Sequence, residues 1–200
     1  IMEEALILDS EDLESRHDLG GNIIPMLTRD GSAKAYDFAN NLVPGATDRD
    51  KGYWRDVGSI DAYFDAHMDL VSVHPIFNLY NREWPLLTNP PSLPPAKFSE
   101  GGIAHDSIVG AGTIIAGGHL NRTVASHDVL VAAGAFVDGS VLMPSVKIGE
   151  RAVVRQAILD KNVIVEPGAQ VGVDLERDSQ RFTISPGGIV VVGKGVRVTA

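Results

Sequence analysis

Apolar residues recur at fixed columns in the second half of the chain. Written in rows of 17, residues 123–139, 140–156 and 157–173 carry valine, isoleucine or alanine at the same five positions of each row. The columns are Val124, Val141 and Ile158; Val129, Val146 and Val163; Val131, Ile148 and Val165; Ala135, Ala152 and Ala169; and Val137, Val154 and Val171. Short strands separated by steps of five or six residues are typical of a parallel β-helix, whose coils stack about 4.8 Å apart. We predict this architecture, with a looser coil over 107–122 before the three rows.

The first half has no such repeat and mixes helical and extended patterns. Residues 2–8 predict a helix, 33–38 predict a short strand, and 40–52 predict a polar loop. A second helix is predicted after Ser59, which suits an N-cap, with Asp61 in the first turn where the helix dipole favours a negative charge. Its apolar residues form one stripe that faces a core: Ile60, Phe64, Met68 and Val71. These elements are too few to enclose a ligand, so we expect them to be the end of a larger domain.

A proline-rich stretch separates the two halves. It contains Pro85, Pro90, Pro91, Pro94 and Pro95. Proline lacks an amide donor and fixes φ, so this stretch favours an extended, semi-rigid connector. We therefore predict a first segment over 1–86, a linker over 87–98 and the β-helix over 99–200.

Composition narrows the class of protein. The chain has 44% hydrophobic and 22% charged residues, which are ordinary globular values, and no cysteine, which excludes disulfides and thiolate metal sites. No apolar run reaches the roughly 18 residues of a membrane span, and the acidic start lacks the basic segment of a signal peptide, so we expect a cytoplasmic protein. Residues 1–96 hold 16 acidic and 7 basic side chains, which argues against generic nucleic-acid binding.

Two carboxylates stand out among the candidate site residues. Asp18 lies in HDLGGNIIP and Asp56 in YWRDVG, each beside glycine. Because glycine lets a ligand approach the backbone closely, such a carboxylate can accept sugar hydroxyls or hold Mg²⁺. The alternative is turn chemistry, in which aspartate bonds its own backbone. The residues alone leave both interpretations open.

Three cations in the second half form another candidate site. Arg155 and Lys161 lie near consecutive corners of the predicted β-helix, and Lys194 follows its terminal strand. They are either solvated surface charges or a pocket for a small phosphorylated effector, since lysine and arginine donate charge-assisted hydrogen bonds to phosphate.

Three histidines raise two further alternatives. His105, His119 and His127 occupy the early coils, where a β-helix acyltransferase could use a histidine as general base, or three histidines could bind zinc. Their spacings place them in no shared column, which disfavours a metal site. The chain also lacks the GxxxxGK[ST] and GxGxxG phosphate loops and the GxSxG elbow.

Several motifs together resemble a known family. HDLGGNIIP, AYDF, YWRDVGSIDAYFDAHMDL, PPAKF, AILDKNVIVEPG and RFTISPGGIVVVGK occur in the order and spacing of bacterial ADP-glucose pyrophosphorylases, the glucose-1-phosphate adenylyltransferases of glycogen synthesis. The resemblance covers nearly the whole chain, is most specific at YWRDVG, and has an actinobacterial character.

The resemblance implies a fold and a reaction. It implies the C-terminal end of an α/β nucleotidyltransferase domain followed by a left-handed β-helix of hexapeptide type, in a homotetramer. The implied reaction joins ATP and glucose 1-phosphate into ADP-glucose and pyrophosphate with Mg²⁺, under control of phosphorylated glycolytic effectors and of AMP or phosphate. Asp56 would then be catalytic and hold the metal, and Asp18 and Trp54 would line the sugar-phosphate pocket. Lys161 and Lys194, with Arg155 nearby, would bind the effector.

The sequence also departs from the family pattern. Asn22 stands where the family usually has an acidic residue, and Ser59 where it often has threonine. The family's glycine- and arginine-rich nucleotide loop, its other catalytic aspartate and its glucose-phosphate lysine motif are not in these 200 residues. We therefore expect the chain alone to be inactive. Two alternatives stay open, a non-catalytic effector-binding or assembly module and a hexapeptide acyltransferase.

Overall fold

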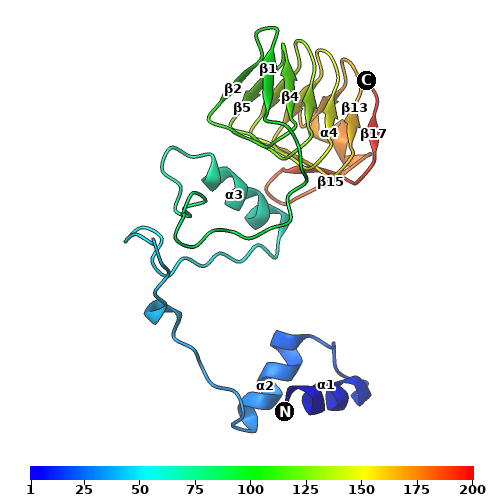
Figure 1. Cartoon of the computed structure of the whole chain (residues 1–200). Helices are drawn as coiled ribbons and strands as arrows, with labels where there is room; N and C mark the ends of the chain where they lie inside the picture. Colours follow the sequence, from blue (N-terminus) through cyan, green and yellow to red (C-terminus); the bar gives the residue numbers. More distant parts are fainter. The chain divides into compact units, whose positions relative to one another are not determined.

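The repeating columns form a parallel β-helix, as the sequence predicted (Figure 1). A computed structural model describes residues 1–200. Three sheets, here called A, B and C, form the sides of the β-helix, and successive coils add one parallel strand to each sheet. The interior is filled by small and branched apolar side chains, such as Val131, Val154 and Leu159, none of which is exposed to solvent.

The strands are two or three residues long and alternate between the sheets. Sheet A contains β1 (Lys97–Ser99), β4 (Ile114–Ala116), β7 (Leu130–Val131), β10 (Lys147–Ile148), β13 (Ile164–Val165) and β17 (Arg197–Val198). Sheet B contains β2 (Ile103–His105), β5 (His119–Asn121), β8 (Phe136–Asp138), β11 (Val153–Arg155) and β14 (Gln170–Val171). Sheet C contains β3 (Ile108–Val109), β6 (Val124–Ala125), β9 (Val141–Leu142), β12 (Ala157–Leu159), β16 (Val190–Val192) and β15 (Thr183–Ile184).

The last coil is interrupted by an insertion. A short helix, α4 (Leu175–Ser179), and strand β15 lie between β14 and β16, and β15 pairs antiparallel with β16. Beyond the insertion the stacking resumes, because Ile164 pairs with Arg197 and Val165 with Val198. The 17-residue spacing therefore becomes 33 residues in the last coil, without loss of register.

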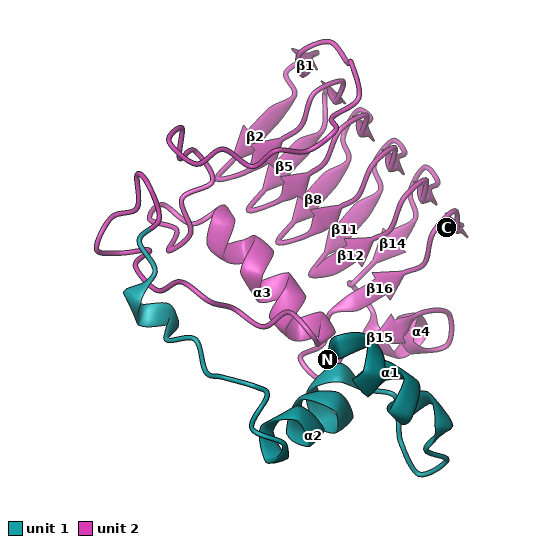
Figure 2. Cartoon of the chain, turned by 60° about the horizontal axis from the view of Figure 1, so that its bottom comes forward, with its two compact units in different colours: residues 1–42 teal, residues 43–200 magenta.

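One of the five apolar columns faces outward rather than into the β-helix. Val141 and Ile158, on the outside of sheet C, pack against Phe64 of helix α3 (Ile60–Leu70). Figure 2 shows α3 running beside this sheet. The predicted stripe of α3 is confirmed for three of its four residues, since Ile60 and Met68 join Phe64 in this cluster, while Val71 follows the end of α3 and is not in it. The core that the stripe faces is the outer surface of the β-helix.

The start of the chain forms a small unit of its own. Residues 1–42 and 43–200 are two compact units (Figure 2). The first contains α1 (Met2–Glu11), a π-helical turn η1 (Leu19–Ile23), α2 (Ile24–Arg29) and a 3-10 turn η2 (Phe38–Asn40). Ala5, Ile23 and Leu27 form its buried cluster. The predicted first helix is confirmed and extends to Glu11.

The predicted strand over 33–38 is wrong. Residues 33–37 have no regular structure, and η2 begins at Phe38. The cause is local, because the Asp37 carboxylate accepts a hydrogen bond from the Ala39 amide at 3.0 Å and another from the Asn40 side chain at 2.8 Å. Such bonds favour a helical turn over an extended chain.

The segment between α3 and the β-helix has little regular structure. Residues 71–96 contain neither helix nor strand, which agrees with the predicted extended connector, and β1 begins at Lys97. The division into 1–86, 87–98 and 99–200 stays a prediction.

Candidate functional site

The YWRDVG loop is attached to the helix that follows it. Arg55 donates a hydrogen bond from Nη1 to the backbone carbonyl of Asp65, in the middle of α3, at 3.2 Å. The Asp56 carboxylate accepts a hydrogen bond from the Gly58 amide at 3.0 Å, and a Cβ on Gly58 would lie only 3.2 Å from the same oxygen. Ser59 caps α3, as predicted, by accepting from the Ala62 amide at 3.1 Å. Arg55 and the cap thus hold the exposed Asp56 in a defined loop.

Aromatic side chains flank this carboxylate. Trp54 is 80% exposed. Tyr53 packs on Phe77, with ring centroids 5.2 Å apart. The loop therefore combines one ring that anchors it with one ring and one carboxylate that face solvent.

The Asp18 carboxylate is hydrogen-bonded to the backbone of its own turn, in the unit of residues 1–42. Its carboxylate accepts a hydrogen bond from the Gly21 amide and so caps η1, while its own amide donates to the Asn22 side chain at 3.3 Å. A Cβ on Gly21 would lie 3.0 Å from the Asp18 carboxylate, so a larger residue here would have to displace that side chain slightly. Asp18 remains exposed, and the capping bond does not prevent it from contacting a ligand.

A buried carboxylate lies behind the Asp18 turn. Asp9 accepts hydrogen bonds from Ser15 Oγ at 2.5 Å and pairs with His17 Nδ1 at 3.0 Å. The Ser15 hydrogen bond, and then that of His17, lower the pKa of Asp9 from its usual 3.8. His17 adopts a left-handed conformation with φ of 54°, which the Asp9 contact holds in place directly before Asp18.

Lys161 and Lys194 occupy the same corner of the β-helix. The pairing of Ile164 with Arg197 makes them equivalent positions on consecutive coils, and the Gly195 amide donates to the Lys161 carbonyl at 2.9 Å. Both side chains are exposed. Coils of a β-helix stack about 4.8 Å apart, so both ammonium groups can reach one anion at this corner.

Arg155 lies at the preceding corner. It ends β11, pairs in register with Asp138, and places its guanidinium 5.6 Å from the Phe136 ring centroid. The predicted arrangement of Arg155 and Lys161 at consecutive corners is confirmed. The structure thus groups Lys161 with Lys194 and keeps Arg155 one corner away.

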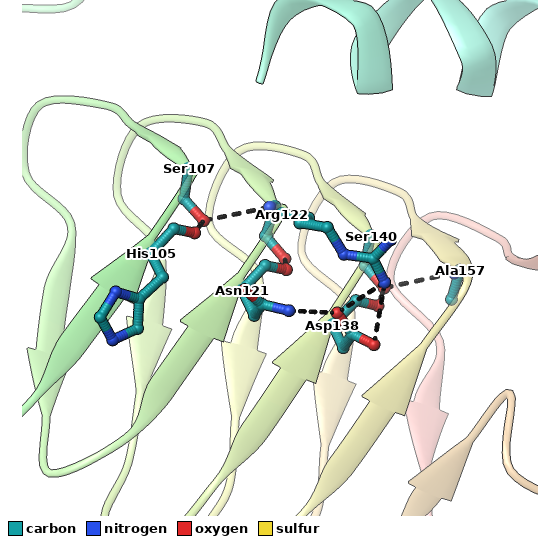
Figure 3. Close-up of polar contacts among 8 residues, drawn as sticks. His105, Ser107, Asn121, Arg122, Asp138, Ser140 and Ala157 are labelled. Atoms are coloured by element: carbon teal, nitrogen blue, oxygen red, sulfur yellow. Dashed lines mark hydrogen bonds and ion pairs between the residues drawn. The ribbon is translucent and has the colours of Figure 1, made fainter. Parts of the chain in front are cut away.

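Polar side chains stack along the Arg155 corner (Figure 3). Asn121 donates to Asp138 at 2.8 Å, and Arg122 bonds both oxygens of Asp138 at 3.0 and 3.2 Å. At the same corner, Ser107 and Ser140 accept hydrogen bonds from the backbone amides of Thr123 and Ala157 on the next coil, at 3.1 and 3.3 Å. These contacts satisfy the polar groups of the corner and bind successive coils together.

The three histidines do not gather. His105 belongs to the corner column of Asn121 and Asp138, and His119 pairs with Phe136 on the face of sheet B. His127 lies in the column that continues to Lys161. No three histidine, aspartate or glutamate side chains form a group suited to a metal ion. None of the helices is long and apolar enough to cross a membrane.

A groove that the sequence did not predict runs beside the lysine corner. It has a volume of about 850 Å³ and lies between α3, residues 88–91 and the outside of sheet C. Its polar lining includes Tyr63, His67, His127 and Lys161. Burial, and then the charge of Asp160, raise the pKa of Tyr63 from its usual 10.0, so this phenol stays a neutral donor. Only the fold brings these groups together, since they come from three segments distant in sequence.

Known proteins match both parts of the chain. A family model described as nucleotidyl transferase matches residues 1–73, and one described as GlmU-like, C-terminal hexapeptide matches residues 94–192. The glucose-1-phosphate adenylyltransferase of Parafrankia sp. is 56% identical over 205 residues, covering 99% of this chain and 50% of the relative. Those of Mycobacterium marinum and Mycobacterium tuberculosis are 62% and 58% identical over 196 residues, covering 98% of this chain and 48% of each relative. Nearly the whole chain is therefore similar to one half of actinobacterial glucose-1-phosphate adenylyltransferases.

These relatives agree with the resemblance seen in the motifs, including its actinobacterial character. The chain spans about half the length of the curated adenylyltransferases it matches. The nucleotidyl transferase match ends at residue 73, so the YWRDVG loop and α3 belong to the transferase-like part. Helix α3 nevertheless packs on the β-helix, which joins the two matched parts physically.

Proposed function

We propose that the chain supplies part of the substrate site of a glucose-1-phosphate adenylyltransferase, which makes ADP-glucose and pyrophosphate from ATP and glucose 1-phosphate for glycogen synthesis. The observation that carries this proposal is the exposed Asp56 carboxylate, held by Gly58 on a loop that Arg55 fixes to α3. High identity to adenylyltransferases over nearly the whole chain supports it.

Asp56 has the chemistry to hold Mg²⁺. One of its oxygens accepts from Gly58, which leaves the other available, and hard carboxylate oxygens are the protein ligands that Mg²⁺ prefers. Bound Mg²⁺ would neutralise charge on the nucleotide and on the departing pyrophosphate. In the proposed reaction a phosphate oxygen of glucose 1-phosphate attacks the α-phosphorus of ATP. Asp18 and Trp54 are the residues that we propose contact glucose 1-phosphate.

Product identification tests the activity. A full-length protein, meaning a polypeptide of the relatives' length that contains these residues, should form ADP-glucose from ATP, glucose 1-phosphate and Mg²⁺, as detected by mass spectrometry. The 200-residue chain alone is the matched comparison, and we expect it to form none, because one exposed carboxylate cannot position both substrates. Formation of a different product by the full-length protein would reject the assignment.

We also propose that the corner of Lys161 and Lys194 binds a phosphorylated effector, with Arg155 contributing from the neighbouring corner. The support is their stacking at equivalent positions, since both ammonium groups can reach one phosphate there. Calorimetric titration of the chain with fructose 1,6-bisphosphate, AMP and inorganic phosphate tests this directly. Binding that persists when both lysines are replaced by alanine would show that the site lies elsewhere.

Subunit assembly is the last part of the proposal. We propose a homotetramer in which the β-helix supplies contact surface, because Ile114 and Leu130 on the outside of sheet A are 41% and 38% exposed and lie in one register column. Sedimentation of the full-length protein tests the assembly. A monomer at micromolar concentration would contradict it.

A further inference from the structure

A carboxylate at the start of α3 is bonded to the last coil of the β-helix. Asp61, two residues after the Ser59 cap, accepts a hydrogen bond from Ser185 Oγ and another from the Gly187 amide at 3.2 Å. Ser185 and Gly187 form the turn between β15 and β16, more than 120 residues later in the chain.

The receiving turn is shaped for this carboxylate. Ser185 is only 6% exposed, and its hydroxyl also accepts from the Ile189 amide at 3.0 Å, which fixes the direction of its own donated bond. A Cβ on Gly187 would lie 2.6 Å from Asp61, closer than packed atoms allow. Ile189, at the end of the turn, packs against Phe64 one helical turn from Asp61. Polar and apolar contacts therefore both hold the first turns of α3 against the turn between β15 and β16. We call this contact the junction.

The junction fixes the element that carries the proposed catalytic loop. Asp56 lies five residues before Asp61, and Arg55 ties the loop to the Asp65 carbonyl of the same helix. The other side of the junction continues through β16, whose Val190 and Val192 are fully buried, to Lys194. The position of Asp56 relative to the β-helix thus depends on how firmly α3 is held at its first turn.

We propose that Asp61 is a positioning residue, which acts through Ser185 and Gly187 to hold the YWRDVG loop in its productive place. This role rests on the proposed function, because it matters for catalysis only if Asp56 takes part in the reaction. Asp61 itself is turned to the β-helix and contacts no reacting group. Small displacements of a reacting group are costly in enzymes, since a shift of about 1 Å can reduce the rate roughly 100-fold.

Two substitutions break the contact from opposite sides. Asp61→Asn removes the charge that accepts both bonds, while Gly187→Ala leaves Asp61 unchanged and inserts a methyl group against it. The matched control is Glu176→Gln, which makes the same charge change at an exposed side chain of α4 outside this contact. In the full-length protein each test variant should lower kcat for ADP-glucose formation by about tenfold, with the KM for glucose 1-phosphate changed less than about twofold. The double variant should be no worse than the more impaired single one, because both break one contact.

Hydrogen exchange tests whether Asp61 holds the YWRDVG loop in place, and it does so without an activity measurement. In the 200-residue chain, the amides of residues 53–58 should exchange faster in Asp61→Asn and Gly187→Ala than in the native protein, while Glu176→Gln behaves as native. Unchanged exchange there, or a normal kcat in both variants below their melting temperature, would overturn the proposal. If the native full-length protein makes no ADP-glucose, the proposed function fails, and the exchange experiment still decides whether Asp61 holds the loop.

Discussion

Lys194 lies directly above Lys161 on the next coil of the β-helix, with the Gly195 amide bonded to the Lys161 carbonyl at 2.9 Å. The two residues are 33 positions apart, because α4 and β15 are inserted between their coils. The sequence repeat therefore gives no sign that they are neighbours. Their side chains are exposed at one corner, where an anion can reach both.

Removing either lysine should weaken the response to effectors. A charge-assisted hydrogen bond contributes roughly 1.5–3 kcal/mol, so Lys161→Ala or Lys194→Ala should raise the half-saturating effector concentration about tenfold or more. The effect on kcat without effector should be much smaller. Effector titration of the full-length protein measures both quantities. Lys147→Ala, an exposed lysine on the face of sheet A, is the control, and equal losses in all three variants would sink the site assignment.

Replacing Asp56 should abolish the chemistry rather than substrate binding. Asp56→Asn keeps the shape of the side chain but removes the charge proposed to hold Mg²⁺, so turnover should fall by at least about 100-fold. The thermal melting temperature should stay close to native, because Asp56 is exposed. Steady-state assays at several Mg²⁺ concentrations measure the loss. Near-normal turnover in this variant would show that the carboxylate has another role.

Shortening a side chain in the interior of the β-helix should strongly lower the stability of the fold. Leu159 is fully buried, so Leu159→Ala should lower the free energy of unfolding by about 2–5 kcal/mol. Leu130 is 38% exposed on the outside of sheet A, and Leu130→Ala should cost less than about 1 kcal/mol. Urea denaturation of the two variants compares them directly. Similar losses would contradict the inward and outward assignment of these leucines.

The β-helix could be predicted because its stability comes from a strict repeat. Each inward column, such as Val137, Val154 and Val171, pairs residues 17 apart, and burial of every member keeps the pattern apolar. The column of Val141 and Ile158 is apolar for a different reason, because α3 covers it from outside. Periodicity identifies buried positions but not which element buries them.

The junction and the groove could not be predicted from the sequence. Asp61 looks like an ordinary first-turn carboxylate, since a helix N-terminus favours negative charge with or without another contact. Its bond to Ser185 depends on the packing of α3 against sheet C. The predicted strand over 33–38 is wrong because of a local contact rather than a distant one. The hydrogen bond that the Asp37 carboxylate accepts from the Ala39 amide outweighs the weak strand propensity of this segment.

The pKa of Asp9 should depend on Ser15. The hydrogen bond from Ser15 stabilises the ionised carboxylate, so the pKa of Asp9 lies below its usual 3.8. A carboxyl with a lower pKa in the folded chain stabilises the fold above the unfolded value and loses this contribution as the pH falls through the folded value. The 1–42 unit should therefore weaken in acid below about pH 3.8.

NMR titration of the Asp9 carboxyl carbon checks this. Ser15→Ala should move the pKa upward toward 3.8, while Ser10→Ala, whose hydroxyl donates to the Ile7 carbonyl instead, should leave it in place. An unchanged pKa in Ser15→Ala would show that this bond does not stabilise the ionised form.

Pyrophosphate release by a fusion protein tests the central claim most directly. The fusion joins this chain to the part of the Mycobacterium marinum adenylyltransferase that it does not match, about half of that relative. With ATP, glucose 1-phosphate and Mg²⁺, the account predicts release at an enzymatic rate, which Asp56→Asn in this chain abolishes. A folded fusion that releases no pyrophosphate, or that binds acetyl-CoA instead, would contradict the account.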